Sequence, residues 1–145
     1  MNDGFWLRVG AVWGFLAVAM GAFGAHGLKD RIDQIGRAEN FHTAAQYHMY
    51  MALVLVAVGL LGLLGRSGAA VQAAGWTFLF GSAIFSGTLY ALSLTGHRWL
   101  GRITPIGGVL ILIGWVALAV AAGAAKKQVP TAWETTSSAE SIDKS

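Results

Sequence analysis

The side chains best suited to chemistry in this sequence are its histidines, at positions 26, 42, 48 and 97. Histidine binds metal ions and exchanges protons near neutral pH. His42 and His48 lie six residues apart, so on one helix they diverge by about 120° and cannot bind one ion together. A site would also need His26 or His97, yet the four long apolar segments contain no Cys, Asp or Glu to complete it. We therefore predict no metal site.

Proton or ion transport is a second role open to histidine, but pumps normally place a carboxylate or an arginine at membrane depth. The apolar segments offer neither, apart from Arg8 at the start of the first. A third role is structural. His48 shares a helical face with Ala44, Ala45 and Ala52, which indicates that it faces other helices and hydrogen-bonds polar groups there.

We group the polar residues near one end of the apolar segments into a candidate polar cluster, which either locks the helices together or binds a ligand. Its members are His26, Gln46, Tyr47, His48, Ser86, Tyr90 and Thr104. A separate stripe, His42, Gln46 and Tyr50, is compatible with lining a crevice or with facing lipid headgroups. No GxSxG, HExxH or phosphate-binding loop occurs, so we predict no enzymatic activity and no cofactor.

The composition of the chain determines which elements can position these side chains. Hydrophobic residues make up 55% of the chain and charged residues 12%. Soluble domains carry roughly a quarter charged residues, so this chain has too little polar surface to cover a globule in water. Its ten Lys and Arg residues are scattered singly between apolar runs and form no basic face, which argues against nucleic acid as a partner.

Four apolar segments, at about 6–25, 43–65, 71–95 and 103–125, reach the roughly 18 to 20 residues that a spanning helix needs. They predict an all-α, integral membrane four-helix bundle, with one transmembrane domain over residues 1–127. A cleaved signal peptide is the alternative for the first segment. Asp3 and a lone Arg8 in place of a basic region argue against that alternative.

Small residues repeat at intervals of three, four and seven along the first segment, and at heptad spacing along the fourth. In lipid, a face of small residues lets a second helix backbone approach closely. The glycines predicted to serve helix packing are Gly10, Gly14, Gly21, Gly24, Gly107 and Gly114.

Residues 26–41 hold six charges, with Leu28, Ile32 and Ile35 at helical spacing, and this pattern predicts a short amphipathic segment at the membrane interface. Residues 128–145 form a polar tail that we predict to be disordered. Basic residues are nearly balanced between the two membrane sides. The pair Lys126-Lys127 and the terminal amine near Arg8 favour cytoplasmic termini.

Four motifs follow one another along the chain. They are Gly21-Ala-Phe-Gly-Ala-His26-Gly-Leu28, Phe41-His-Thr43-Ala-Ala-Gln46-Tyr47-His48-Met-Tyr50, Phe85-Ser-Gly-Thr-Leu-Tyr90, and Leu100-Gly-Arg-Ile-Thr104-Pro105-Ile-Gly107-Gly108 with Gly114-Trp115. In this order they resemble the bacterial domain-of-unknown-function family 423, related to eukaryotic transmembrane protein 256, over residues 5–125. The resemblance implies a small multi-pass protein, usually of the bacterial inner membrane. It brings no activity, cofactor or catalytic residue.

These features lead us to expect a non-enzymatic membrane helper or scaffold, or a protein that binds a lipid or a quinone-like ligand in the polar cluster. The alternative is a subunit of an oligomeric transporter or channel for an ion or small molecule, because four short helices barely enclose a pathway alone. The expected partners are the lipid bilayer and either further copies of the chain or other membrane proteins.

Overall fold

The computed structural model of the chain describes residues 4–125. It comprises α1 (Phe5–Ala25), α2 (Lys29–Ile35), α3 (Ala38–Leu63), α4 (Ala69–Thr95), a short 3₁₀-helix (Arg98–Arg102) and α5 (Thr104–Ala125). Within these residues the chain forms helices and turns and no strand, which confirms the predicted all-α class. The predicted polar tail, residues 128–145, lies outside the described residues.

Four of these helices, α1, α3, α4 and α5, are long and apolar enough to cross a membrane. Helix α3 begins at Ala38, earlier than the apolar segment that starts near residue 43. The reason is local. Gly36 adopts a left-handed backbone conformation, with φ of 70°, and ends α2 just before α3 starts. The polar residues 38–42 therefore continue the spanning helix into the interface.

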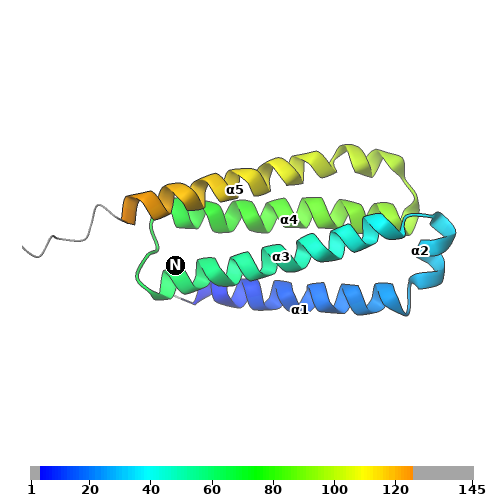
Figure 1. The fold of residues 1–145 in the computed structure, drawn as a ribbon, viewed down its shortest axis with the longest axis horizontal. Helices are drawn as coiled ribbons and strands as arrows, with labels where there is room; N and C mark the ends of the chain where they lie inside the picture. The colour runs from blue at the N-terminus through cyan, green and yellow to red at the C-terminus, as the bar shows by residue number, and fades with distance from the viewer. Residues whose placement is uncertain (1–3, 126–145) are drawn as a thin grey trace, which may run out of the picture.

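The long helices run antiparallel and lie side by side in the order α1, α3, α4, α5 (Figure 1). We call the end that holds Phe5, the loop 64–68 and Ala125 the terminal end, and the opposite end, with residues 26–37 and 96–103, the α2 end. Helix α5 packs along α4 and makes little contact with α3. The order of backbone packing is therefore open, with α1 and α5 at its two ends, and the side chains of Trp6 and Trp13 in α1 reach α4.

Glycines allow the closest helix contacts, as the sequence predicted for several of them. A Cβ built on Gly10 of α1 would lie 2.6 Å from the backbone nitrogen of Val56 in α3. A Cβ on Gly24 would overlap the ring of Phe41, and one on Gly114 of α5 would lie 2.8 Å from the ring of Phe78. A residue with a Cβ would therefore collide with the neighbouring helix at these crossings.

Gly21, one of the glycines predicted to serve helix packing, makes no close helix contact within residues 4–125. A Cβ at this position would meet nothing within 4 Å. The antiparallel register sets Gly14 against Ala52 and Gly24 against Phe41, which places Gly21 opposite Ala45. Two small residues that face each other leave room between the helices, so periodicity alone does not produce a close contact.

Helix α2 is the predicted amphipathic segment, and it closes the α2 end of the bundle. Ile32 is buried at 3% exposure, while the charged residues of the helix face outward. The Nε of Arg31 donates a hydrogen bond of 2.9 Å to the carbonyl oxygen of Leu94, near the end of α4. This bond satisfies a carbonyl group that the helix leaves free at its C-terminal end.

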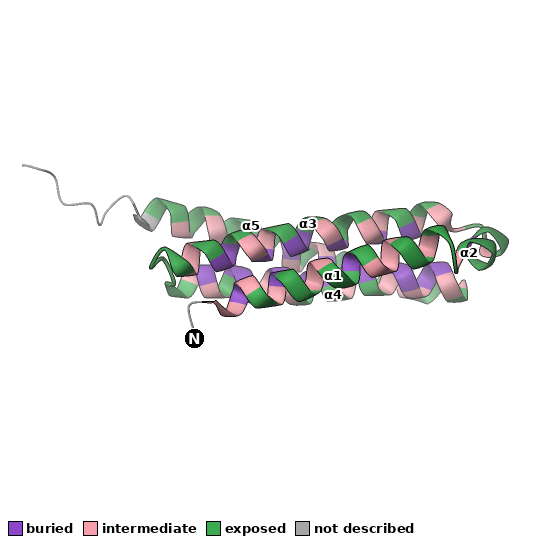
Figure 2. Ribbon diagram, turned by 90° about the horizontal axis from the view of Figure 1, so that it is seen from below, coloured by how far each residue is buried: buried purple, intermediate pink, exposed green. Residues whose placement is uncertain are grey.

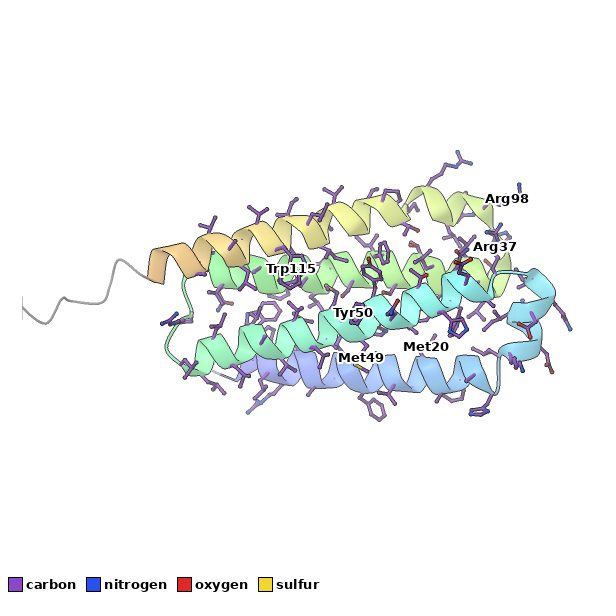
Figure 3. All side chains as sticks on the ribbon, in the orientation of Figure 1. Met20, Arg37, Met49, Tyr50, Arg98 and Trp115 are labelled. Carbon is purple, nitrogen blue, oxygen red and sulfur yellow. The ribbon has the colours of Figure 1, made fainter. Side chains whose placement is uncertain are left out.

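Buried residues run along the inner seams of the bundle, and exposed residues cover its outer surface (Figure 2). The outer surface is apolar along most of its length: Phe15, Val18, Leu53, Leu112 and Val116 are all exposed by 60% or more. Basic side chains such as Arg37 and Arg98 lie at the α2 end (Figure 3). Apolar flanks between charged ends are the surface that a bilayer solvates.

Candidate functional site

The polar residues of the predicted cluster that come together lie where α3 meets α4. His48, Ser86 and Tyr90 are buried, with exposures of 6%, 2% and 8%. The Tyr90 hydroxyl lies 3.5 Å from Nδ1 of His48, which is a long hydrogen bond. Ser86 precedes Tyr90 by one helical turn, so it shares the face of α4 that meets His48.

Trp13 of α1 completes this group, although the sequence analysis did not include it. Its indole ring packs edge-on against the His48 ring, with centroids 4.9 Å apart. Its Nε1 donates a hydrogen bond of 2.9 Å to Oγ of Ser82 in α4. The signal that could have identified it is its place near the middle of a spanning helix, because tryptophan normally concentrates at the membrane interfaces.

Two polar atoms in this group have no hydrogen-bond partner among the described residues. They are Nε2 of His48 and Oγ of Ser86, and both are buried. A buried polar group without a partner costs free energy, so such groups are rare outside functional or water-containing sites. We call His48, Ser86, Tyr90, Trp13 and Ser82 the central polar group.

The remaining members of the predicted cluster do not join the central polar group. His26 and Gln46 are exposed, and none of their side-chain atoms makes a hydrogen bond within residues 4–125. Tyr47 is 38% exposed and packs against the ring of Phe85. Sequence position places these residues near one membrane face, but the rotation of each helix turns them outward.

Thr104 belongs to a separate pair near the α2 end. It is buried at 9% exposure, and its hydroxyl lies 2.8 Å from the hydroxyl of Thr88. This bond joins the start of α5 to α4. The predicted cluster therefore divides into a central group, a threonine pair and several outward-facing residues.

Two cavities lie at opposite ends of the bundle. The first, of about 450 Å³, is at the terminal end and is lined by Leu61, Gly65, Arg66, Ser67, Gly68, Ala69, Ala70, Val71, Leu118, Ala121 and Ala122. The second, of about 260 Å³, is at the α2 end and is lined by residues that include Lys29, Asp33 and His42. No member of the predicted cluster lines either of them.

The described part of the chain holds no group of three or more His, Asp or Glu side chains placed to bind a metal ion. The chemistry available in the centre is therefore that of a histidine, a tyrosine and two serines in an apolar surrounding. These groups donate and accept hydrogen bonds and offer neither a paired base and nucleophile nor a buried carboxylate.

Comparison with known proteins gives the family. The family described as "Protein of unknown function (DUF423)" matches residues 20–108. The chain belongs to this family. Every member of the predicted polar cluster falls in the matched part, whereas Trp13 lies outside it. No solved structure matches the chain.

Relatives within the DUF423 family come from bacteria and yeast. "UPF0382 membrane protein YwdK" of Bacillus subtilis is 46% identical over 114 residues, which cover 79% of this chain and 92% of the relative. A "UPF0382 membrane protein" of Haemophilus influenzae is 40% identical over a match that covers 79% of this chain and 90% of the relative. A UPF0382 membrane protein of Schizosaccharomyces pombe is 39% identical over a match that covers 78% of this chain and 97% of the relative. The chain is thus a multi-pass membrane protein of the DUF423 family.

Proposed function

We propose that this protein is a non-enzymatic membrane helper or scaffold that packs against another transmembrane helix. The observation that supports the proposal is an unoccupied face of small residues on α4. Ala83 and Gly87 lie one turn apart on this face, both exposed, and a Cβ on Gly87 would meet nothing within 4 Å. Elsewhere in the bundle, single glycines such as Gly10 and Gly107 bring helix backbones together.

The open order of the helices supports the same proposal. Helix α1 packs on α3 and reaches α4 through side chains such as Trp6 and Trp13, and α5 packs on another side of α4. Phe80, Ala83 and Gly87 of α4 nevertheless stay exposed within residues 4–125. Van der Waals packing against a small-residue face drives helix association in lipid, where the hydrophobic effect contributes little. The partner is another copy of the chain or a different membrane protein.

Photo-crosslinking in intact membranes tests the proposal. Benzoylphenylalanine replaces Phe80, which is 55% exposed on the same face of α4 as Ala83. We expect a crosslinked product from this position, and loss of at least four-fifths of it when Gly87→Leu is added, because a bulky side chain blocks close approach. The mass of the product separates a second copy of the chain from another protein.

The matched control places benzoylphenylalanine at Leu112, which is 65% exposed on α5 and flanked by large side chains. This position should yield lipid adducts and no discrete protein product. Equal protein products from both positions, or a product at Phe80 that Gly87→Leu leaves unchanged, would contradict a specific docking face.

A transporter or channel subunit is the second candidate, supported by the polar stripe of α3. His42, Gln46 and Tyr50 are all exposed on the outer surface of this helix. Copies of the chain that met along this stripe would enclose polar groups at membrane depth, as a pathway requires. Crosslinking of a second copy from the position of Tyr50 would favour this candidate.

Within the helper function, we also propose a ligand site in the central polar group. The unpartnered Nε2 of His48 and Oγ of Ser86 could hydrogen-bond the polar end of a lipid-like or quinone-like molecule. Such binding would require the helices to separate locally, because both side chains are buried. The variant His48→Ala in the lipid experiment described below tests it.

We further propose that the protein resides in the inner membrane of the cell with both termini in the cytoplasm. Arg8 and Arg66 lie at the terminal end, and the pair Lys126-Lys127 follows α5 in the sequence. Three acidic residues, Asp30, Asp33 and Glu39, dilute the basic residues of the α2 end. A C-terminal green fluorescent protein fusion should fluoresce, and an alkaline phosphatase fusion should be inactive. Phosphatase activity would reverse the orientation.

A further inference from the structure

The cavity at the terminal end combines a basic side chain with an apolar wall, and it is separate from both the docking face of α4 and the central polar group. We propose that it binds an anionic phospholipid, with the phosphate against Arg66 and one acyl chain between α3 and α5. This binding site goes beyond the proposed scaffold function and does not depend on it.

The polar part of the cavity favours a negative charge. Arg66 lies in the loop between α3 and α4, and none of the lining residues within 4–125 is acidic. Gly68, Ala69 and Ala70 bring the first turn of α4 to the cavity, and this turn has neither a side-chain cap nor an acidic residue. An arginine at this position attracts phosphate, and the free N–H groups of the helix start add to its effect.

The apolar part of the cavity fits a hydrocarbon chain. Leu61 of α3 forms one side, and Leu118 and Ala121 of α5 form the other. Helix α5 packs on α4, and the cavity lies between α5 and the end of α3. The volume of about 450 Å³ lies within the range of small-molecule sites and is large enough for a headgroup phosphate with the first part of an acyl chain.

The position of the cavity in the bilayer agrees with this ligand. The cavity lies where α3 ends at Leu63 and α4 begins at Ala69, which is the headgroup level of a helix that spans the membrane. Basic pockets between spanning helices at this depth are suited to anionic headgroups. A free phosphate ion would use Arg66 but would leave the apolar wall without a partner.

Native mass spectrometry of the full chain tests the proposal. The protein is purified in detergent and mixed with equal amounts of phosphatidylglycerol and phosphatidylcholine that carry the same acyl chains. We expect phosphatidylglycerol adducts to dominate in the wild type. Arg66→Gln should lower the ratio of the two adducts about fivefold, the equivalent of about 1 kcal/mol for one arginine near an anionic group.

Matched variants distinguish lipid binding in this cavity from nonspecific attraction to a basic residue and from binding to the apolar surface of the bundle. Arg8→Gln removes an exposed arginine at the same end that does not line the cavity, and it should leave the ratio unchanged. Ala122→Phe should obstruct the cavity and reduce phosphatidylglycerol adducts severalfold. Ala119→Phe, at another exposed position on α5 outside the cavity, should leave these adducts unchanged. The phenylalanine pair tests the site even if Arg66→Gln folds poorly.

Three results would overturn the proposal. In the first, Arg66→Gln and Arg8→Gln lower the ratio equally, which would indicate nonspecific charge attraction. In the second, millimolar inorganic phosphate displaces the lipid, which would show that the apolar wall contributes nothing. In the third, His48→Ala abolishes lipid retention while Arg66→Gln preserves it, which would place the ligand in the central polar group. Loss of crosslinking from Phe80 would affect only the scaffold proposal.

Discussion

Replacing Gly107 with alanine will destabilise the bundle by about 1 to 3 kcal/mol, whereas the same change at the adjacent Gly108 will not. A Cβ on Gly107 would overlap the backbone nitrogen of Phe85 and lie 2.7 Å from the carbonyl oxygen of Gly81. The contacted atoms belong to the backbone of α4 and cannot move aside as a flexible side chain would. The two helix backbones must therefore move apart at this crossing.

Gly108 provides an unusually close control for this experiment. Its Cβ would lie 3.8 Å from the Phe85 ring, an ordinary van der Waals contact. Because alanine forms helices better than glycine by up to about 1 kcal/mol, Gly108→Ala should be neutral or stabilising. Thermal unfolding in detergent, followed by circular dichroism, compares the two variants. Equal melting temperatures would contradict the α4–α5 contact described above.

The second large effect is expected at Trp13. Trp13→Ala removes the ring that packs against His48 and the donor that bonds Ser82, and it leaves a cavity where α1, α3 and α4 meet. Large-to-small changes at packed aromatic residues cost about 3 to 5 kcal/mol, and partial burial places Trp13 near the lower value. The free energy of unfolding, measured by steric trapping in bicelles, should fall by about 3 kcal/mol.

Two further variants separate packing from hydrogen bonding at this position. Trp13→Phe keeps most of the ring contact and loses the bond to Ser82, so it should cost about 1 kcal/mol. Trp99→Ala removes a tryptophan that is 53% exposed outside the long helices, and it should change the free energy by less than about 1 kcal/mol. If Trp13→Ala and Trp99→Ala had the same effect, the central polar group would not stabilise the fold.

The four long helices could be predicted from the sequence because the bilayer imposes a simple constraint. Every backbone polar group must find a partner within the membrane, and a helix provides one when about 20 residues lack charge. The sequence also predicted that His48 faces the other helices, because small residues share its face of α3. Both the spanning helices and the direction of His48 can be predicted from residues within a single helix.

Other features depend on what a neighbouring helix presents, and sequence periodicity does not contain that information. Gly24 and Gly21 fall on one face of α1, yet Gly24 meets Phe41 while Gly21 lies opposite a small residue. His26 sits near the correct membrane side for the polar cluster, but the end of α1 turns it outward. Trp13 was missed because a tryptophan is usually interpreted as an interfacial anchor.

The pairing of helices has a consequence for how the chain assembles. The most extensive contacts join α1 to α3 and α4 to α5, and each of these pairs is connected by a short segment at the α2 end. Each pair is a helical hairpin. Its two helices can insert into the membrane and pack together once they are synthesised, and the first hairpin can do so before the second hairpin is made. We therefore expect the two hairpins to form first and then to dock through the α3–α4 contacts and the contacts of Trp6 and Trp13 with α4. The loop 64–68 is then the natural place to divide the gene into two halves that reassemble in the membrane.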